Sequence, residues 1–408
     1  MSSEISAAAL DVAAVRAHFP ALASGTAFFD GPGRSQVPDV VADAIRDALT
    51  SPIANRGVVT EAERNAATIV TRARAAMADM LGADADGIVF GRSMTQLTYD
   101  FARTLARSWR AGDEVVVTRL DHDANARPWV QAAAAVGAVV RWADFDPETG
   151  ELTSDDVAAQ LSERTRLVAV TGASNLIGTR PPLDRLAALV HDRGALFYVD
   201  GVHLAPHAPI DFKTIGADLF VCSPYKFLGP HCGVLAGRPE VLERLAPDKL
   251  LPASDRVPER FELGTLPYEL LAGTTATVDF LATLAGTQSG DRRARVTAAM
   301  SAIECHEDEL RCTIEHGLAE LPGVTVRSRA TDRTPTLLLT FDGRAAADAY
   351  TFLAQRGVNA PAGSFYALEA SRRLGLGDSG GLRIGLAPYT DADDAARLLA
   401  GLAEFLDA

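Results

Sequence analysis

The stretch "ADLFVCSPYKFLGPH", residues 217–231, places a lysine, Lys226, directly after a short apolar run. Lysine is rare in this 408-residue chain, because only Lys213, Lys226 and Lys249 occur among its 39 Lys and Arg residues. The run 218–223 has the length and composition of a buried β-strand. Residues that follow the carboxyl ends of parallel strands are the ones that meet ligands. The position of Lys226 therefore predicts a functional lysine.

Around this stretch, β-rich runs alternate with amphipathic helical segments from about residue 85 to 236. The predicted strands are 113–118, 138–145, 165–172, 195–200 and 218–223, and the predicted helices between them are 95–109, 125–136, 154–161 and 183–192. A long helix is also predicted before this region, at 60–81. Strands that alternate with helices predict an α/β fold with a mostly parallel sheet sandwiched by helices. Residues 238–290 form a transition with Pro and Gly breaks. From about 291 a smaller α+β unit is predicted, with a long helix, a strand at 335–341, a helix at 345–355, a Gly-rich loop, a strand at 381–388 and a last helix at 391–406.

Composition excludes several classes of protein. A net charge of −14 argues against nucleic-acid binding, which usually needs a basic face. No apolar run is long enough to span a membrane, and the N-terminus lacks the pattern of a signal peptide. The four cysteines form neither a disulfide framework nor a zinc motif, so no metal site is predicted. A cytoplasmic location is the expectation.

Polar residues follow four successive predicted strands, and one of them is the lysine. A buried lysine has a lowered amine pKa and can form a Schiff base with a carbonyl, for which pyridoxal 5'-phosphate (PLP) is the common partner. Such a site needs a carboxylate at the pyridine nitrogen, a phosphate cradle at a helix N-terminus and a flat group on the ring. The candidates are Asp200 for the ring nitrogen, His122 for stacking, Asn175 and His203 for the phenolic oxygen, and Ser93, Met94, Thr95 and Ser223 for the phosphate.

Each candidate also has an ordinary structural explanation. An aspartate after a strand is often a turn or cap residue, and a histidine in a loop is often solvated. Ser93 before a helix fits an N-cap without any ligand. Lys226 alone fits a surface lysine. The order and spacing of the residues together favour the cofactor hypothesis.

This order resembles the fold-type I PLP enzymes of the class V aminotransferase and cysteine desulfurase group. The resemblance covers roughly residues 20 to 405 and rests on the segments "FFDGPGRSQVP" (28–38), "DHDANARPW" (121–129), "SNLIGT" (174–179), "VDGVHLAPH" (199–207), "SPYKFLGPHCGVLAGR" (223–238), "FELGTLPYELLAG" (261–273) and "LRIGLAPYT" (382–390). It implies an N-terminal segment, 1–26, that packs on the small domain, a large PLP-binding domain, 27–290, and a small C-terminal domain, 291–408.

The resemblance also implies roles for further residues. The expected assembly is a homodimer with shared active sites, in which Thr265 reaches the phosphate held by the other subunit. Tyr225 belongs to the cofactor site, where desulfurases usually carry a histidine. Arg383 is expected to clamp the carboxylate of a small amino-acid substrate, as a bidentate guanidinium can. The expected substrate-side residues are completed by Asn55, Arg56 and Tyr366.

One departure from the group concerns the nucleophile. Cysteine desulfurases carry a cysteine on the loop before the arginine strand, whereas residues 357–381 contain none and Tyr366 stands at that place. We therefore expect a C–S lyase that works by β-elimination without persulfide chemistry. A class V aminotransferase is the alternative, and epimerisation also stays open. A non-catalytic PLP-fold protein is less favoured, because Lys226 and Asp200 are both kept.

Overall fold

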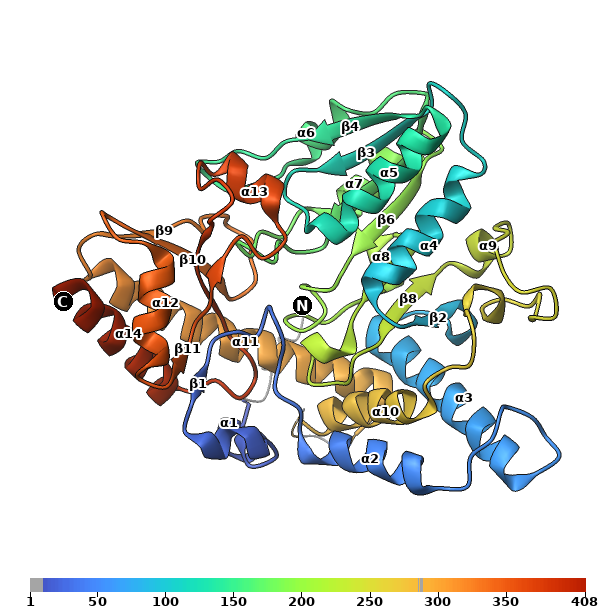
Figure 1. Ribbon diagram of the computed structural model, residues 1–408, viewed down its shortest axis with the longest axis horizontal. Helices are drawn as coiled ribbons and strands as arrows, with labels where there is room; N and C mark the ends of the chain where they lie inside the picture. The colour runs from blue at the N-terminus through green and yellow to red at the C-terminus, as the bar shows by residue number, and fades with distance from the viewer. Residues whose placement is uncertain (1–9, 285, 287–288) are drawn as a thin grey trace, which may run out of the picture.

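The computed structural model describes residues 10–284, 286 and 289–408, and its centre is a seven-stranded sheet (Figure 1). The strand order is β2-β8-β7-β6-β5-β3-β4, and only β8 runs antiparallel to its neighbours. The strands are β2 Ile88–Gly91, β3 Glu114–Thr118, β4 Val139–Ala143, β5 Thr165–Thr171, β6 Leu196–Asp200, β7 Leu219–Cys222 and β8 Gly233–Gly237. The predicted α/β fold with a mostly parallel sheet is confirmed.

Alternation along the central strands divides their side chains between two apolar cores. In β5, Leu167 and Ala169 join one core, whereas Val168 and Val170 join the other. Both sets are apolar because both faces of the sheet are covered, which is why these strands lack polar alternation. One face is covered by α4 Met94–Ala106 and α5 Arg127–Val136, and the other mainly by α3 Glu61–Leu81, α7 Leu183–His191 and α10 Tyr268–Thr283.

Helix α10 and α2 Asp39–Thr50 were not predicted from the sequence. Helix α10 packs against α2, α3 and α11, so it is apolar on most sides and shows no amphipathic period. Its Gly273 looks like a break, yet a Cβ there would lie 2.7 Å from Ile45 of α2. The glycine therefore permits close helix packing, and tertiary contacts override its low helix propensity.

The C-terminal part contains a second sheet, of order β12-β13-β10-β9, with helices packed on it (Figure 1). Its elements are α11 Arg292–Ala319, β9 Val324–Val326, β10 Thr336–Phe341, α12 Ala346–Ala354, β11 Val358–Asn359, β12 Ala362–Gly363, α13 Leu368–Arg373, β13 Gly381–Gly385 and α14 Ala392–Asp407. The remaining short elements are α1 Val12–Arg16, η1 Pro20–Ser24, β1 Ala27–Phe28, η2 Ala85–Gly87, η3 Asp123–Asn125, α6 Ser154–Ala158, α8 Phe212–Ile215, η4 Pro224–Lys226, α9 Pro239–Leu242 and η5 Glu259–Phe261.

The N-terminal residues join the C-terminal part to the main sheet. Strand β1 pairs with β11, and Arg16 contacts Asp394 at 2.7 Å. Phe19 meets the ring of Phe280 on α10 with centroids 6.1 Å apart. Residues 1–9 lie outside the described part, and the expected packing of the segment 1–26 on the small domain stays a prediction. The domain boundary at residue 290 stays a prediction.

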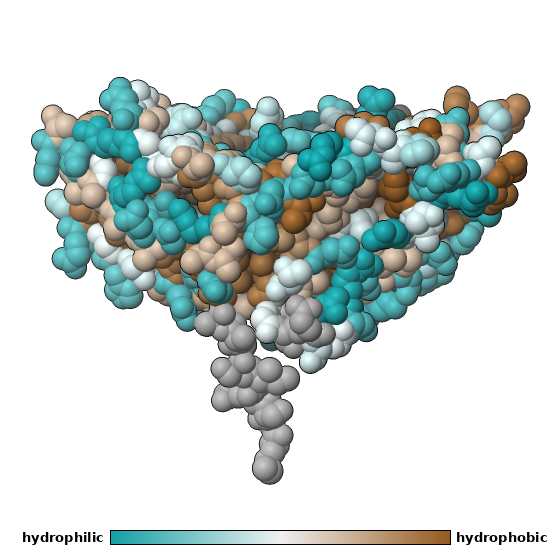
Figure 2. Space-filling view, turned by 90° about the horizontal axis from the view of Figure 1, so that it is seen from below, coloured by the Kyte–Doolittle hydropathy of each residue, from teal (hydrophilic) through white to brown (hydrophobic). Residues whose placement is uncertain are grey.

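None of the described helices is both long enough and apolar enough to cross a membrane. Figure 2 shows one face of the molecule, on which hydrophilic residues are interspersed with apolar ones rather than separated from them.

A buried ion pair connects α3 to the segment that carries Thr265. Both terminal nitrogens of Arg74 contact the Glu262 carboxylate, at 2.8 and 2.7 Å, and the N–H of Phe90 donates to the same carboxylate at 2.9 Å. Arg74 also donates to the carbonyl of Ile88 in β2. The side chains of Arg74 and Glu262 are only 10% and 4% exposed, so each charge depends on the other.

We expect the substitution Glu262→Ala to lower the free energy of unfolding by about 3–5 kcal/mol, because it leaves a buried guanidinium without a counter-charge. The matched control is Asp43→Ala, which breaks the exposed Arg46–Asp43 pair and is expected to cost less than about 1 kcal/mol. Urea denaturation at neutral pH measures both values. Equal losses in the two variants would contradict the assigned importance of the buried pair.

Candidate active site

A cavity of about 490 Å³ opens at the carboxyl ends of the parallel strands. Its wall is built by loops that follow β3, β5, β6 and β7, by the start of α4, and by residues from β13 and the loop before α13. The structure brings the following sequence-predicted residues together in this wall: Met94, Thr95, His122, Asn175, Asp200, His203, Tyr225, Lys226, Tyr366 and Arg383.

Lys226 lies in the 3-10 turn η4 that follows β7. Its Nζ donates to the carbonyls of Pro32 and Gly33, the latter at 2.8 Å. Burial and the positive charge of Arg383 lower the pKa of Lys226 to about 7, against the opposing effect of Asp200 and Asp30. A lysine with such a pKa can act as a base near neutral pH.

Asp200 ends β6 and is buried. Its Oδ1 accepts the N–H of Val202 at 3.0 Å, and within the described chain no donor contacts Oδ2. Burial raises the pKa of Asp200 to about 6, although Lys226 opposes the shift. A buried carboxylate with a free oxygen is suited to bind a protonated ring nitrogen.

The start of α4 forms a cradle next to an unpaired hydroxyl. Ser93 caps the helix by accepting the N–H of Gln96 at 3.1 Å, and Met94 and Thr95 line the cavity. The buried Oγ of Ser223 has no partner within the described residues. A Cβ at Gly233 would lie 2.7 Å from the backbone nitrogen of Met94, so only glycine lets β8 approach the helix end this closely. Helix starts of this kind bind phosphate.

His122 offers a flat ring to the cavity. Burial and Lys226 lower the pKa of His122 to about 4, so the ring is neutral at physiological pH. Its Nδ1 accepts the N–H of Ala124 at 3.0 Å, which leaves the proton on Nε2. Tyr366 stacks on His122 with centroids 5.5 Å apart and is itself 76% exposed. Together the two rings cover one side of the cavity.

Asn175 and His203 each present an unpaired buried atom. The amide nitrogen of Asn175 donates to the carbonyl of Phe365 at 2.9 Å, and its Oδ1 has no partner in the part of the chain described. His203 contacts the Thr336 hydroxyl through Nε2 at 2.8 Å, while Nδ1 is likewise unpaired. Burial, with a smaller effect of His207, puts the pKa of His203 well below its usual value.

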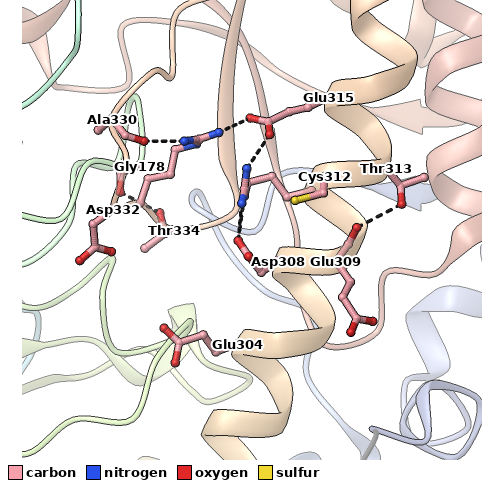
Figure 3. Close-up of polar contacts among 12 residues, drawn as sticks. Gly178, Glu304, Asp308, Glu309, Cys312, Thr313, Glu315, Ala330, Asp332 and Thr334 are labelled. Atoms are coloured by element: carbon pink, nitrogen blue, oxygen red, sulfur yellow. Dashed lines mark hydrogen bonds and ion pairs between the residues drawn. The ribbon is translucent and has the colours of Figure 1, made fainter.

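Thr334 holds the loop that carries Asn175 through a hydrogen bond to Gly178, which Figure 3 shows. Thr334 donates its hydroxyl to the carbonyl of Gly178 at 3.3 Å. The Thr334 oxygen also lies 3.1 Å from His203 Nε2. Nearby, Glu315 accepts from Arg333 and Arg311 at 2.6 and 2.5 Å. Helix α11 thereby holds the loop before β10 against the floor of the site.

Arg383 lies on β13 with its guanidinium in the cavity wall. Its Nη1 donates to the carbonyl of Asn175 at 3.0 Å, and its guanidinium carbon lies 3.6 Å from the centroid of the Phe365 ring. Nε is buried and unpaired within the described residues. Burial lowers the pKa of Arg383 to about 9, against the effect of Asp30. A cation that is ordered but not ion-paired is suited to bind a carboxylate.

Thr265, Asn55 and Arg56 do not line this cavity in the single chain. All three are exposed, and Arg56 pairs with Glu259 at 3.0 Å. Thr265 lines a separate hollow beside Gln96. The role of Thr265 toward a second subunit and the substrate-side roles of Asn55 and Arg56 stay predictions. Ser93 and Ser223 also lie outside the lining, next to the phosphate cradle.

Some residues of the cavity wall were given no role from the sequence. Pro32 and Gly33 hold Lys226, and Tyr99 of α4 lines the cavity. The segment 28–38 was noticed only for its resemblance to a family. Its Gly-Pro-Gly sequence, 31–33, was the available signal, because such turns allow close backbone approach.

Residues 27–398 match the family model of aminotransferase class-V. An uncharacterized protein of Mycobacterium tuberculosis is 33% identical, over 97% of this chain and 100% of its own length. A probable cysteine desulfurase of Mycobacterium leprae is 31% identical, over 99% of this chain and 98% of its own length. The crystal structure of cysteine desulfurase CsdA from Escherichia coli aligns with a TM-score of 0.86 at 27% sequence identity. The alignment covers 98% of this chain and 99% of that structure's chain. A C-DES mutant with glycine covalently linked to its PLP cofactor aligns with a TM-score of 0.78 at 20% sequence identity, over 95% of this chain and 99% of its own. This likeness supports the fold alone.

We expect Asp200→Asn to stabilise the ligand-free chain at pH 7.5, because the folded state otherwise keeps a buried carboxylate ionised. The pKa of Asp200 in the folded state, about 6, lies above the ordinary value of 3.8. The ionised carboxylate therefore destabilises the folded state, and this destabilisation is greatest at high pH. The gain is expected to be about 2–3 kcal/mol at pH 7.5 and to disappear as pH falls to 4.

The control is Asp113→Asn, since the hydrogen bond from Arg166 holds the pKa of Asp113 below its usual value. That variant is expected to lose stability at pH 7.5. Urea midpoints at the two pH values measure both effects. A loss of stability in Asp200→Asn at pH 7.5 would contradict the account of this site.

Proposed function

This chain belongs to the aminotransferase class-V family of PLP-dependent enzymes, and we propose that it cleaves the Cβ–S bond of an S-substituted cysteine by β-elimination, without a persulfide on the enzyme. The observation that carries the proposal is the loop beside Arg383. It brings Phe365 and Tyr366, and no thiol, to the part of the cavity where the substrate side chain would lie.

The residues present fit PLP. Three unpaired buried atoms at the site correspond to groups of the cofactor: Ser223 Oγ to the phosphate, and Asn175 Oδ1 and His203 Nδ1 to the phenolic oxygen. The second carboxylate oxygen of Asp200, which accepts no hydrogen bond within the described residues, corresponds to the ring nitrogen. Lys226 is the residue that would hold the aldehyde carbon. When bound, the cofactor supplies an electron sink for the bond that breaks at Cα.

The side chains then have distinct tasks. Arg383 and the Asn175 loop bind the substrate carboxylate and fix the orientation of Cα. Lys226 Nζ removes the proton from Cα, which its lowered pKa permits near neutral pH. Asp200 keeps a proton on the ring nitrogen. The His122 and Tyr366 rings exclude water from one side of the reacting atoms.

The loop that replaces the desulfurase cysteine is held in place by hydrogen bonds. Phe365 and Tyr366 have φ angles of 51° and 60°, a region that costs energy for residues other than glycine. The side-chain amide of Asn175 donates to the carbonyl of Phe365, and the N–H of Asp123 donates to the carbonyl of Tyr366 at 2.7 Å. Sulfur relay needs a loop that can leave the site, so a fixed loop supports elimination inside the cavity.

The cysteines elsewhere in the chain do not offer a substitute nucleophile. Cys222 and Cys232 are buried, and burial raises the pKa of both thiols. Cys305 and Cys312 lie on α11, outside the cavity lining. A thiol must ionise to attack sulfur, and none of these is placed to do so at the substrate.

We also propose a homodimer with shared active sites. Thr265, Asn55 and Arg56 are exposed in the single chain, and apolar side chains near them are exposed as well, Val58 by 82% and Leu263 by 52%. Covering this surface with a second copy would bury these apolar side chains and bring Thr265 to a neighbouring site.

The proposed reaction predicts the products of the PLP-loaded protein. From S-substituted L-cysteines we expect the free thiol, pyruvate and ammonia in equal amounts, since elimination breaks Cα–H and Cβ–S and water then releases ammonia. Chromatography of the products, with Lys226→Ala as the inactive control, measures this. Alanine together with protein-bound persulfide would indicate a desulfurase instead. A keto acid that retains the sulfur, with lasting loss of the visible cofactor band, would indicate the alternative, an aminotransferase.

A further inference from the structure

The turn Asp30–Arg34 contributes Pro32 and Gly33 to the cavity wall, next to Lys226 of η4. The N–H groups of Gly33 and Arg34 donate to the carbonyl of Asp30, at 2.7 and 3.0 Å. The carbonyls of Pro32 and Gly33 point the other way and accept from Lys226 Nζ. The turn thus presents two oxygen acceptors to the lysine.

The turn is also packed tightly on the strand that carries Arg383. The N–H of Gly385 donates to the carbonyl of Phe29 at 2.9 Å, and Asp30 forms a bridge with Gly385. A Cβ at Gly385 would lie 2.0 Å from Pro32 Cδ. A Cβ at Gly31 would lie 2.6 Å from the carbonyl oxygen of Leu386, which follows β13. The glycines are required by this contact, so the turn and Arg383 keep a fixed relation.

The side chain of Asp30 is a charged group that the proposed mechanism does not yet use. Its Oδ1 is buried and unpaired, and Asp30 makes no ion pair in the described part of the chain. The cations around it are Arg383 on β13, Arg34 in the same turn and Lys226 in η4. Burial raises the pKa of Asp30, and the hydrogen bonds and arginines around it oppose that shift.

We propose that the turn Asp30–Arg34 serves the proton-transfer step: the Pro32 and Gly33 carbonyls hold Lys226 as an ammonium ion, and Asp30 is a positioning residue whose negative charge offsets that of Arg383. This inference rests on the proposed function only in taking Lys226 as the group that moves the Cα proton.

The step needs a lysine that can both gain and lose a proton. When Nζ removes the Cα proton, the C–H bond breaks, an N–H bond forms and the electron pair stays on the substrate. When the sulfur leaves, that N–H bond breaks and an S–H bond forms. Two carbonyl acceptors and a nearby carboxylate stabilise the ammonium between these events.

The charges that face Lys226 come from several elements. Asp200 of β6 and Asp30 of the turn favour its ammonium form, whereas Arg383 of β13 disfavours it. His122 and His203 face the same space and are neutral, as their lowered pKa values show. Without Asp30, Arg383 would act on Lys226 with one opposing carboxylate fewer.

The isosteric substitution Asp30→Asn removes the charge and keeps the shape. The PLP-loaded protein is titrated by its visible absorption band, whose midpoint reports the protonation of the lysine–cofactor link. We expect the midpoint to fall by about one pH unit, and the acid limb of the kcat/KM profile to move in the same direction. Asp30→Glu, which restores the carboxylate, is expected to return the midpoint toward the wild-type value.

The matched control is Asp394→Asn, which removes another buried carboxylate from the C-terminal part, where its partner is Arg16. That variant is expected to leave the midpoint unchanged. An unchanged midpoint in Asp30→Asn, or equal shifts in Asp30→Asn and Asp394→Asn, would overturn the proposal. The products of the wild-type protein test the proposed function separately, because the titration needs no substrate.

Discussion

The removal of charged side chains from water at one edge of a parallel sheet is the constraint on which the site depends. Asp200 and Arg383 are buried there and Lys226 is half-buried, and within the described chain none of them has an ion-pair partner in contact. Burial lowers the pKa of the lysine and the arginine and raises that of the aspartate. Each of these three side chains is therefore suited to bind a charged or polar group of a ligand. Removing these charges from water costs folding free energy, and the apolar cores on both faces of the sheet offset that cost.

Rigid supports keep these groups in position. The turn at residues 30–34 is packed on β13, the Asn175 loop is held by Thr334 and α11, and the loop at Phe365 is fixed by main-chain contacts. Most of these contacts join the C-terminal part to the loops of the central sheet. Catalytic groups held by rigid neighbours lose little freedom when the substrate binds.

Much of this arrangement could be predicted from the sequence, for identifiable reasons. The strand ends around Lys226 and Asp200 were found because buried parallel strands are short, apolar and followed by polar residues. Helix α10 was missed because a helix buried on most sides carries no amphipathic period. The role of Pro32 and Gly33 was missed because it uses backbone carbonyls, which every residue possesses. Thr265 lies outside the cavity of the single chain, so its predicted role at the phosphate stays untested by this structure.

The central claim is that Lys226 is the lysine that binds the cofactor, and the scarcity of lysine makes it directly testable. The PLP-loaded protein is reduced with borohydride, digested and analysed by mass spectrometry. The account predicts the cofactor mass on the peptide that contains Lys226 and on no other. Lys213 is exposed beside Asp84, and Lys249 contacts Asp255. Cofactor mass on either of these lysines, or on none, would contradict the account.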